Sequence, residues 1–285
     1  MKTRIFAGML AAGAVTASLN ACSEKNPPPP CNVGHGDYAA KYLYVEGSKT
    51  GEGTCDQLHG EAIGIDKYYP TDGGESLVAL QPESAMALGL TPAEESNLFA
   101  IGNLESEQPT PESFCNLVNM KAADTLLTPA PVELLEDGGV PDGSGIDLSQ
   151  GTVSEGEDGG YVFQPNDVPV KYEFSNVKFW VIGTAPSAQQ FTADLKFTEG
   201  SCSAQYKVVG MYPAVHCMGE DADGNAVADD SLCSPFEDYD AGRLFGSGIF
   251  YQFDTFCDAK TGYCQLKADT IGKSTLLPKY QSEYP

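Results

Sequence analysis

The stretch EDADGNAVADD, residues 220–230, is the best candidate for a metal site in the chain. Calcium loops place carboxylate and amide oxygens at alternating positions, where these oxygens replace the hydration shell of the ion. The loop departs from the usual pattern, because its glycine comes too early and Leu232 stands where a bidentate glutamate is expected. We expect either a structural Ca²⁺ site or a solvated acidic turn. The candidate ligands are Asp221, Asp223, Asn225 and Asp229.

The three histidines, His35, His59 and His216, stand in no recognisable catalytic motif. The chain has no G-x-S-x-G nucleophile turn, no H-E-x-x-H zinc motif, no phosphate-binding loop and no dinucleotide fingerprint. Acidic residues are so frequent that a glycosidase-type carboxylate pair has no identifiable position. We therefore expect no enzymatic activity, no catalytic residues and no cofactor apart from Ca²⁺.

The chain holds nine cysteines, an odd number that needs an explanation in an exported protein. No C-x-x-C pair and no Cys/His spacing of the zinc type occurs. Cys22 stands apart from the others, because it directly follows an apolar N-terminal run. The remaining count is even, as expected for disulfides in an oxidising compartment. These candidates are Cys31, Cys55, Cys115, Cys202, Cys217, Cys233, Cys257 and Cys264.

The N-terminus has the features of a bacterial export signal. Lys2 and Arg4 precede the uncharged run IFAGMLAAGAVTASL, which is too short for a typical transmembrane helix. The run ends in Leu-Asn-Ala-Cys, residues 19–22, which resembles the lipobox of bacterial lipoproteins. Asn20 departs from the small residues that are usual at its position.

This resemblance implies that residues 1–21 are removed and that Cys22 becomes a lipid-modified N-terminus. Ser23 after that cysteine implies the outer membrane, with the protein facing the periplasm or the cell surface. The alternative is ordinary cleavage after Ala21 and secretion without a lipid. Residues 22–37 include SEKNPPPP, which predicts an extended linker between the lipid anchor and a folded domain over residues 38–285.

One disulfide can be guessed from local spacing. The stretch FCDAKTGYC predicts a β-hairpin whose strands would bring Cys257 and Cys264 face to face. A bond between Cys217 and Cys233 could close the acidic loop between them. The other connections do not follow from the sequence.

The net charge of −24, from 40 acidic and 16 basic residues, restricts the partners. Such a chain repels nucleic acids and anionic headgroups, and it has no basic patch for them. We expect membrane association through the N-terminal lipid, no nucleic acid, and a protein or envelope-polymer partner.

The chain pattern predicts a mainly β fold: an antiparallel sandwich or barrel-like sheet with one or two short helices, long acidic loops and disulfides. Residues 190–200, QFTADLKFTEG, alternate strictly between apolar and polar, and residues 41–47, 61–69, 168–183 and 202–215 also predict strands. The Ala- and Leu-rich stretch from Pro82 predicts the helices. Residues 131–160 contain a stretch dense in Gly, Ser and acids, which predicts a long mobile loop or linker.

These features together predict a membrane-anchored cell-envelope lipoprotein with a non-enzymatic binding or structural role. Two alternatives stay open at this point. One is a secreted-type hydrolase whose site is assembled from distant residues, and the other is a calcium-dependent surface adhesin.

Overall fold

A computed structural model describes residues 30–71, 73–88, 97–127, 131–135, 138–140, 148–155, 160–181, 188–251 and 253–267. The predicted signal peptide, Cys22 and the first half of the linker lie outside these residues, as does any second helix within residues 89–96. In the described part of the chain, no helix has the length and apolar character needed to cross a bilayer.

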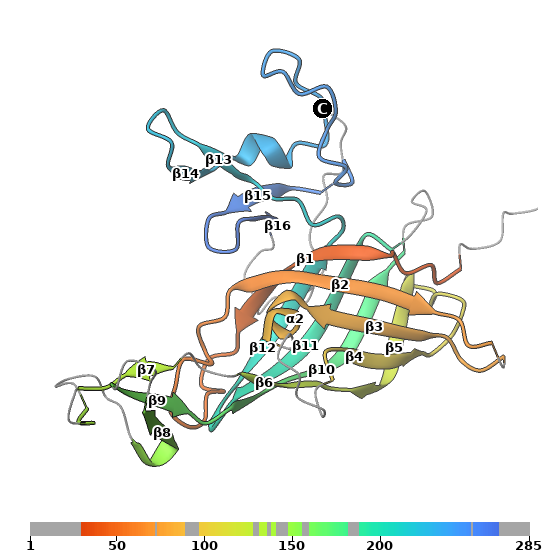
Figure 1. The fold of residues 1–285 in the computed structure, drawn as a ribbon. Helices are drawn as coiled ribbons and strands as arrows, with labels where there is room; N and C mark the ends of the chain where they lie inside the picture. Colours follow the sequence, from red (N-terminus) through yellow and green to blue (C-terminus); the bar gives the residue numbers. More distant parts are fainter. Residues whose placement is uncertain are drawn as a thin grey trace, which may run out of the picture.

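Nine antiparallel strands form one large sheet, and eight of them close on themselves (Figure 1). Most strands pair with the next strand in the chain, but β5 is followed in the sheet by β10. Closure comes from the pairing of β1 with β12 and of β10 with both β5 and β11. The eight strands are β1 (Gly36–Tyr44), β2 (Gly60–Tyr68), β3 (Leu77–Pro82), β4 (Ala100–Leu104), β5 (Phe114–Lys121), β10 (Val168–Trp180), β11 (Gln190–Glu199) and β12 (Cys202–Met211). The ninth, β6 (Ala123–Leu127), continues β5 along the other end of β10.

The alternation in the sequence accounts for which side of each strand faces the core. The apolar set of β11 is buried, from Phe191 at 1% exposure to Phe197 at 4%. The ring of Phe191 lies against Gly210 on β12, where any side chain would collide with it. Aromatic rings of Tyr38, Phe179 and Phe191 meet edge to face or tilted inside the closed sheet. The predicted mainly β, antiparallel fold is confirmed, and the barrel-like alternative describes it.

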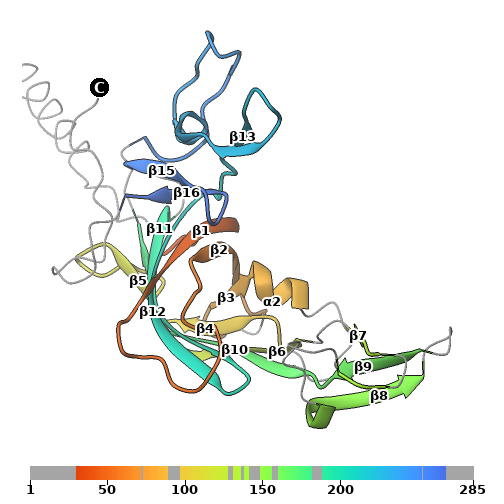
Figure 2. The same ribbon diagram turned by 90° about the vertical axis from the view of Figure 1, so that its left-hand side faces the viewer.

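The predicted helix is one short element, α2 (Glu83–Leu88), which follows β3 directly. Ala85 of this helix is completely buried in the barrel core. The helix packs near β2, β3 and β6, at the edge of the barrel (Figure 2).

The region over residues 131–160 contains more structure than its composition predicts. In its described parts, the strands β7 (Val132–Glu133), β8 (Gly151–Glu155) and β9 (Tyr161–Pro165) form a separate three-stranded sheet, with the short 3-10 helix η1 (Leu148–Gln150) before β8. Strand β9 lies in the middle and leads into β10. Backbone pairing with β9 therefore orders a segment that buries little apolar surface of its own.

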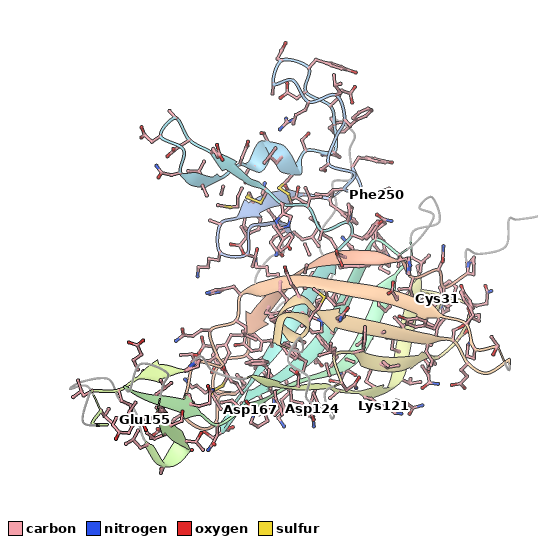
Figure 3. All side chains as sticks on the ribbon, viewed as in Figure 1. Cys31, Lys121, Asp124, Glu155, Asp167 and Phe250 are labelled. Carbon is pink, nitrogen blue, oxygen red and sulfur yellow. A yellow bond between two sulfur atoms is a disulfide. The ribbon has the colours of Figure 1, made fainter. Side chains whose placement is uncertain are left out.

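The folded part of the chain begins before the predicted boundary at residue 38. Cys31 and Val33 are buried, and β1 starts at Gly36. Cys31 lies at one end of the barrel, and the sheet of β7–β9, which carries Glu155, lies at the opposite end (Figure 3).

Residues 213–267 form a second small unit, which we call the stapled module. It consists of β13 (Met218–Glu220), β14 (Ala226–Ala228), the 3-10 helix η2 (Asp230–Cys233), β15 (Thr255–Asp258) and β16 (Tyr263–Leu266). Its core includes Ile249, Phe253 and Leu266, which pack with Val209 and Met211 of β12. The module thus sits on the outside of the barrel over β1 and β12 (Figure 2).

All eight cysteines of the described chain form disulfides, which agrees with the even count. The predicted hairpin is present, with Cys257 and Cys264 in register on β15 and β16. The predicted bond between them is wrong, because each is bonded to a cysteine outside the hairpin. Two bonds, Cys31–Cys115 and Cys55–Cys202, lie in the barrel, and two, Cys217–Cys257 and Cys233–Cys264, lie in the module. A Cys217–Cys233 bond is therefore also absent.

The geometry explains why the sequence spacing of Cys257 and Cys264 predicted the wrong disulfide bond. Partners in an antiparallel pair are close enough for a disulfide, so the hairpin alone permits the predicted bond. Folding also brings Cys217 and Cys233 to the hairpin, with Cα–Cα distances of 5.6 Å to Cys257 and Cys264, respectively. These bonds join the hairpin to the segments that precede it, which a bond within the hairpin would not do.

Candidate functional site

The predicted calcium loop forms the tip of the β13–β14 hairpin, and its first aspartate accepts several hydrogen bonds from the turn itself. Asp221 Oδ1 accepts hydrogen bonds from the backbone N–H groups of Asp223 and Asn225, at 2.9 and 2.8 Å. The Asn225 amide also donates to Asp221 Oδ2, at 3.1 Å. These hydrogen bonds, the one from the Asn225 backbone first, lower the pKa of Asp221.

Asp229, the fourth predicted ligand, lies at the other end of the hairpin. Its backbone pairs with Cys217, and its carboxylate accepts from the Ser231 N–H to cap η2. The structure thus brings Asp221, Asp223 and Asn225 into one turn but places Asp229 elsewhere. In the described residues, no three carboxylate or histidine groups converge to form a metal site.

We expect Ca²⁺ to leave the melting temperature of the module unchanged. Extracellular calcium modules bind Ca²⁺ with a Kd of about 0.1–1 mM. At a free Ca²⁺ concentration of 100 times Kd, binding would raise the free energy of unfolding by about 2.7 kcal/mol. An ion at this turn would lack Asp229 as a ligand and would compete with the Asn225 amide for Asp221 Oδ2, which offsets the gain. The measurement is a thermal melt with CaCl₂ and with EDTA. A calcium-dependent increase that the Asp223→Asn variant lacks would contradict this expectation.

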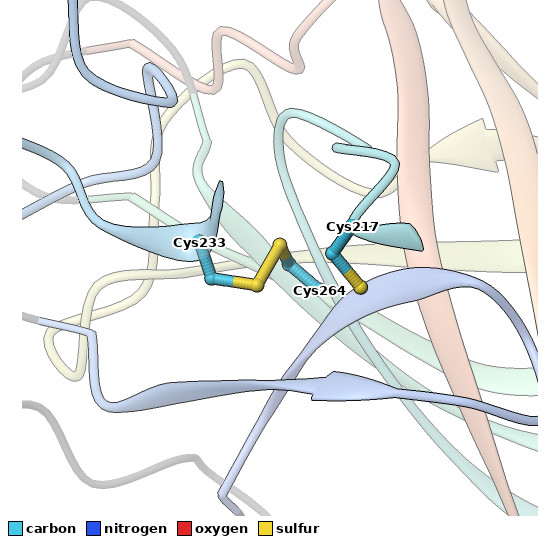
Figure 4. Close-up of side chains that lie close together, drawn as sticks. All are labelled: Cys217, Cys233 and Cys264. Carbon is cyan, nitrogen blue, oxygen red and sulfur yellow. A yellow bond between two sulfur atoms is a disulfide. The ribbon is translucent and has the colours of Figure 1, made fainter. Parts of the chain in front are cut away.

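Three sulfur atoms of the module, from Cys217, Cys233 and Cys264, lie within 4.8 Å of one another (Figure 4). This distance would suit a metal centre if the thiols were free. Each is bonded in a disulfide, however, so none can supply the thiolate that a metal needs. The three sulfur atoms therefore belong to the two disulfide bonds that cross-link the module.

The histidines are spread over the molecule and form no catalytic group with one another. His35 is exposed and pairs with Asp66, while His59 lies 3.4 Å from Lys260 Nζ. The ring of His216 stacks on Tyr263 with 4.3 Å between ring centres. In the part of the chain that the structure describes, these contacts of the histidines include no serine or cysteine nucleophile.

A polar cluster that the sequence did not predict lies where α2 meets the barrel, with Glu61 and Ser84 half-buried beside buried tyrosines. Glu61 on β2 points to the same side as the core residues of its strand, because it pairs with the buried Ala40 of β1. Its Oε1 accepts a hydrogen bond from the Tyr42 hydroxyl at 2.8 Å. Its Oε2 accepts from both the backbone N–H and the hydroxyl of Ser84 on α2, at 2.6 and 2.5 Å. Each carboxylate oxygen therefore has a donor.

The cluster extends to a third strand and to the module. The Ser84 hydroxyl lies 2.5 Å from the hydroxyl of Tyr172 on β10. Because the single Ser84 hydroxyl proton points to Glu61, Tyr172 is the donor in that contact. Next to Ser84, Glu83 accepts from the hydroxyl of Tyr263 in the module, at 3.2 Å. The helix is thus joined to the barrel through Ser84 and to the module through Glu83.

Burial is the main cause of the shifted pKa values in this cluster. Desolvation raises the pKa of Glu61 above its ordinary value, although its hydrogen bonds with Ser84 and Tyr42 act in the opposite direction. Desolvation and the Glu61 charge also raise the pKa of Tyr42 and Tyr172. The pKa of Tyr263 is raised to about 12, by partial burial and then by Glu83. The tyrosines are therefore neutral donors at physiological pH.

This geometry favours a structural role for Glu61. The first N–H groups of a helix have no partner within the helix, and a carboxylate is a good acceptor for them. Glu61 meets this need at α2 and holds the helix to the barrel. The sequence does contain a signal for it, since Glu61 shares the two-residue period of Ile63 and Ile65, both completely buried.

The second unpredicted feature is a projecting turn, residues 236–245, which we call the apolar hairpin. Asp238 and Arg243 pair through two backbone hydrogen bonds and an ion pair of 3.1 Å. Gly242, with φ of 75°, completes the tight turn between them. The hairpin is therefore ordered, and it lies on the side of the module away from the barrel (Figures 1 and 2).

The apolar hairpin exposes large apolar side chains that would normally be buried. Phe245 is 84% exposed, Tyr239 70%, Leu244 64% and Phe236 38%. Single exposed apolar residues are common, but a group of four on one short turn points to a binding surface. The sequence showed only an acidic segment with scattered aromatics there, because exposure depends on the surrounding fold.

Comparison with known proteins identifies the family. A family model described as MlpA matches residues 36–213, which span the barrel from the start of β1 to just beyond β12. A Myxococcus xanthus protein described as "Putative lipoprotein MlpA" is 23% identical over 269 residues, covering 88% of this chain and 90% of that protein. No solved structure matches the chain. The relative supports the lipoprotein class predicted from residues 19–22. The chain belongs to the MlpA family.

Proposed function

We propose that this protein is a lipid-anchored lipoprotein of the outer membrane with a non-enzymatic binding or structural role. The observation that carries the binding role is the apolar hairpin, which is ordered, exposed and held on a disulfide-bonded module. The lipoprotein relative supports the anchor. The export signal and Cys22 add the sequence argument for the same location.

The interior of the barrel supports a non-enzymatic role. An enzyme or a carrier that works inside a barrel needs a hollow there with convergent polar groups. Here the core is filled by large side chains, including the completely buried Tyr38 and Ile63. The buried polar groups at Glu61 are engaged with one another and with the backbone of α2.

The proposed anchor also orients the molecule. Cys22 is separated from the buried Cys31 by a short proline-rich stretch, which spans about 30 Å when extended. The end of the barrel that carries Cys31 would then face the membrane. The sheet of β7–β9 would point away from it, and the stapled module would project from the side.

Intact mass and peptide mapping of the mature protein purified from membranes test the anchor. We expect a chain that begins at Cys22, carries acyl groups there and has all eight other cysteines paired as in the structure. Two or more acyl chains give stable membrane attachment. A control variant, Cys22→Ser, should be lost from the membrane fraction. A wild-type protein with a free Cys22 thiol, or one that retains Met1, would contradict the proposal.

A further inference from the structure

A pocket of about 230 Å³ opens on the wall formed by β10, β11 and β12. Lys196 and Lys207 lie at this pocket, together with Ser175, Asp194 and Gln205, and Val45 adds an apolar contact. Lys207 is paired with Asp194 at 2.5 Å, and Lys196 is paired with Glu173 at 3.2 Å. The pocket is thus rimmed by ordered, charged side chains.

An irregularity in β10 accompanies the pocket. The pairing of β10 with β11 shifts register between Ser175 and Lys178. Asn176 within this bulge has a φ of 51°, and its amide donates to Asp194 at 2.7 Å. Bulges bend a strand and interrupt its pairing, which explains a hollow on an otherwise regular wall.

The wall around the pocket is positive, in contrast to the chain as a whole. Its outward positions carry two acids, Glu173 and Asp194. The same positions carry four lysines, although the whole chain has only 16 basic residues against 40 acidic ones. The lysines are Lys171, Lys178, Lys196 and Lys207. Lys171 and Lys196 pair with Glu173, and Lys207 pairs with Asp194, so four lysines against two acids leave an excess of two positive charges. This excess attracts an acidic surface.

The apolar hairpin has the complementary character. It is exposed, and Leu244 and Phe245 follow the Asp238–Arg243 pair on the returning side of the turn. Glu237 and Asp240 add negative charge, while Asp238 and Arg243 neutralise each other. The hairpin cannot reach the pocket of its own chain, because it points away from the barrel in both views (Figures 1 and 2).

We propose that the apolar hairpin of one copy docks in the β10–β12 pocket of a second copy. This inference rests on the proposed binding or structural role and names its partner as the same protein. The two surfaces differ, so the contact is head to tail, and repetition gives a ring or an open chain of molecules. Val45 offers the apolar contact at the pocket, and the excess positive charge of the wall fixes the approach through charge complementarity.

Sedimentation velocity of the mature lipoprotein in a density-matched detergent tests the association. We expect the mass to rise with protein concentration and to fall with added salt, which screens the charges. The double variants Leu244→Ser with Phe245→Ser and Lys196→Glu with Lys207→Glu should each weaken association by about 30-fold or more, as expected for loss of a central contact. Tyr69→Ser, on an exposed tyrosine outside both surfaces, is the matched control and should associate normally.

A mixture of the two double variants distinguishes head-to-tail contact from other modes. Each variant keeps one intact surface, so the mixture should form heterodimers and nothing larger. Circular dichroism verifies that both variants are folded. A wild-type protein that stays monomeric throughout, association that survives both changes, or a mixture without heterodimers would overturn the inference. A monomer with acylated Cys22 would leave the proposed anchor standing, whereas an associating protein with unmodified Cys22 would overturn only the anchor.

Discussion

Replacing Cys233 and Cys264 with serine is expected to unfold the stapled module at temperatures at which the barrel stays folded. The bond closes a segment of 31 residues, and its loss costs about 4 kcal/mol in the chain-entropy model. The strand pairs of the module are only three or four residues long, so the Cys217–Cys257 bond and a small apolar core are what remain to hold it. The barrel keeps its own core and its own two disulfides.

Trp180 provides the measurement for this prediction. It is the only tryptophan of the chain and packs, partly buried, against the core of the module. Loss of the module should therefore move the Trp180 emission to longer wavelength well before the far-UV signal of the barrel is lost. The matched control is removal of the Cys55–Cys202 bond by two serine substitutions, which alters the barrel and not the module. A single common transition for the Cys233/Cys264 variant would contradict the prediction.

The disulfides also show where sequence-based prediction ends. Strands such as β11 were predictable, because apolar and polar residues alternate and the pattern itself states which side is buried. Closure of the sheet was not predictable, because it depends on the pairing of β1 with β12 and of β10 with both β5 and β11. These pairings join distant segments, and no local pattern specifies them. The same limit applies to Cys257. It lies opposite Cys264 in the hairpin, but its disulfide bond is to Cys217.

The candidate sites differ in how far they could be predicted. Spacing alone suggested the Asp221 loop, but the backbone N–H groups of the turn occupy its first carboxylate. Glu61 could have been found by its position in the alternation, since it shares the buried side of β2 with Ile63. The apolar hairpin could not have been found from the sequence, because Phe245 and Leu244 are residue types that are usually buried. Only the position of the module shows that nothing in the described chain covers them.

Truncation of Glu61 is the second change with a large expected effect. Glu61→Ala leaves the Tyr42 hydroxyl and the Ser84 hydroxyl and N–H without their acceptor. Each buried unsatisfied group costs about 1–3 kcal/mol, and relief of the desolvated charge offsets part of this. We expect the free energy of unfolding to fall by about 3 kcal/mol in urea titrations. Glu105→Ala, on an exposed acid, is the control and should change it little.

The titration of Glu61 predicts how stability depends on pH. Its pKa in the folded protein is raised from the ordinary value of 4.5, so the folded state binds the proton more tightly than the unfolded state. Stability from this group is therefore fully present below pH 4.5 and is lost as the pH rises through the raised pKa. The Glu83 carboxylate and the hydroxyls of Tyr42, Tyr172 and Tyr263 face the same cluster. The tyrosines stay protonated in this range, so their charge does not change.

Glu61→Gln isolates this dependence from that of the other acids. The amide does not titrate, so the stability of the variant relative to wild type should rise with pH above 4.5 and then reach a plateau. Asp56→Asn should show the opposite trend at lower pH. The hydrogen bond from Lys49 lowers the pKa of Asp56 below its ordinary value of 3.8, so the wild type gains stability relative to the variant as the pH rises toward 3.8. Equal trends for the two variants would contradict the assignment. The carboxylate at α2 would then be hydrated rather than buried, and α2 would be held to the barrel mainly by the packing of Ala85.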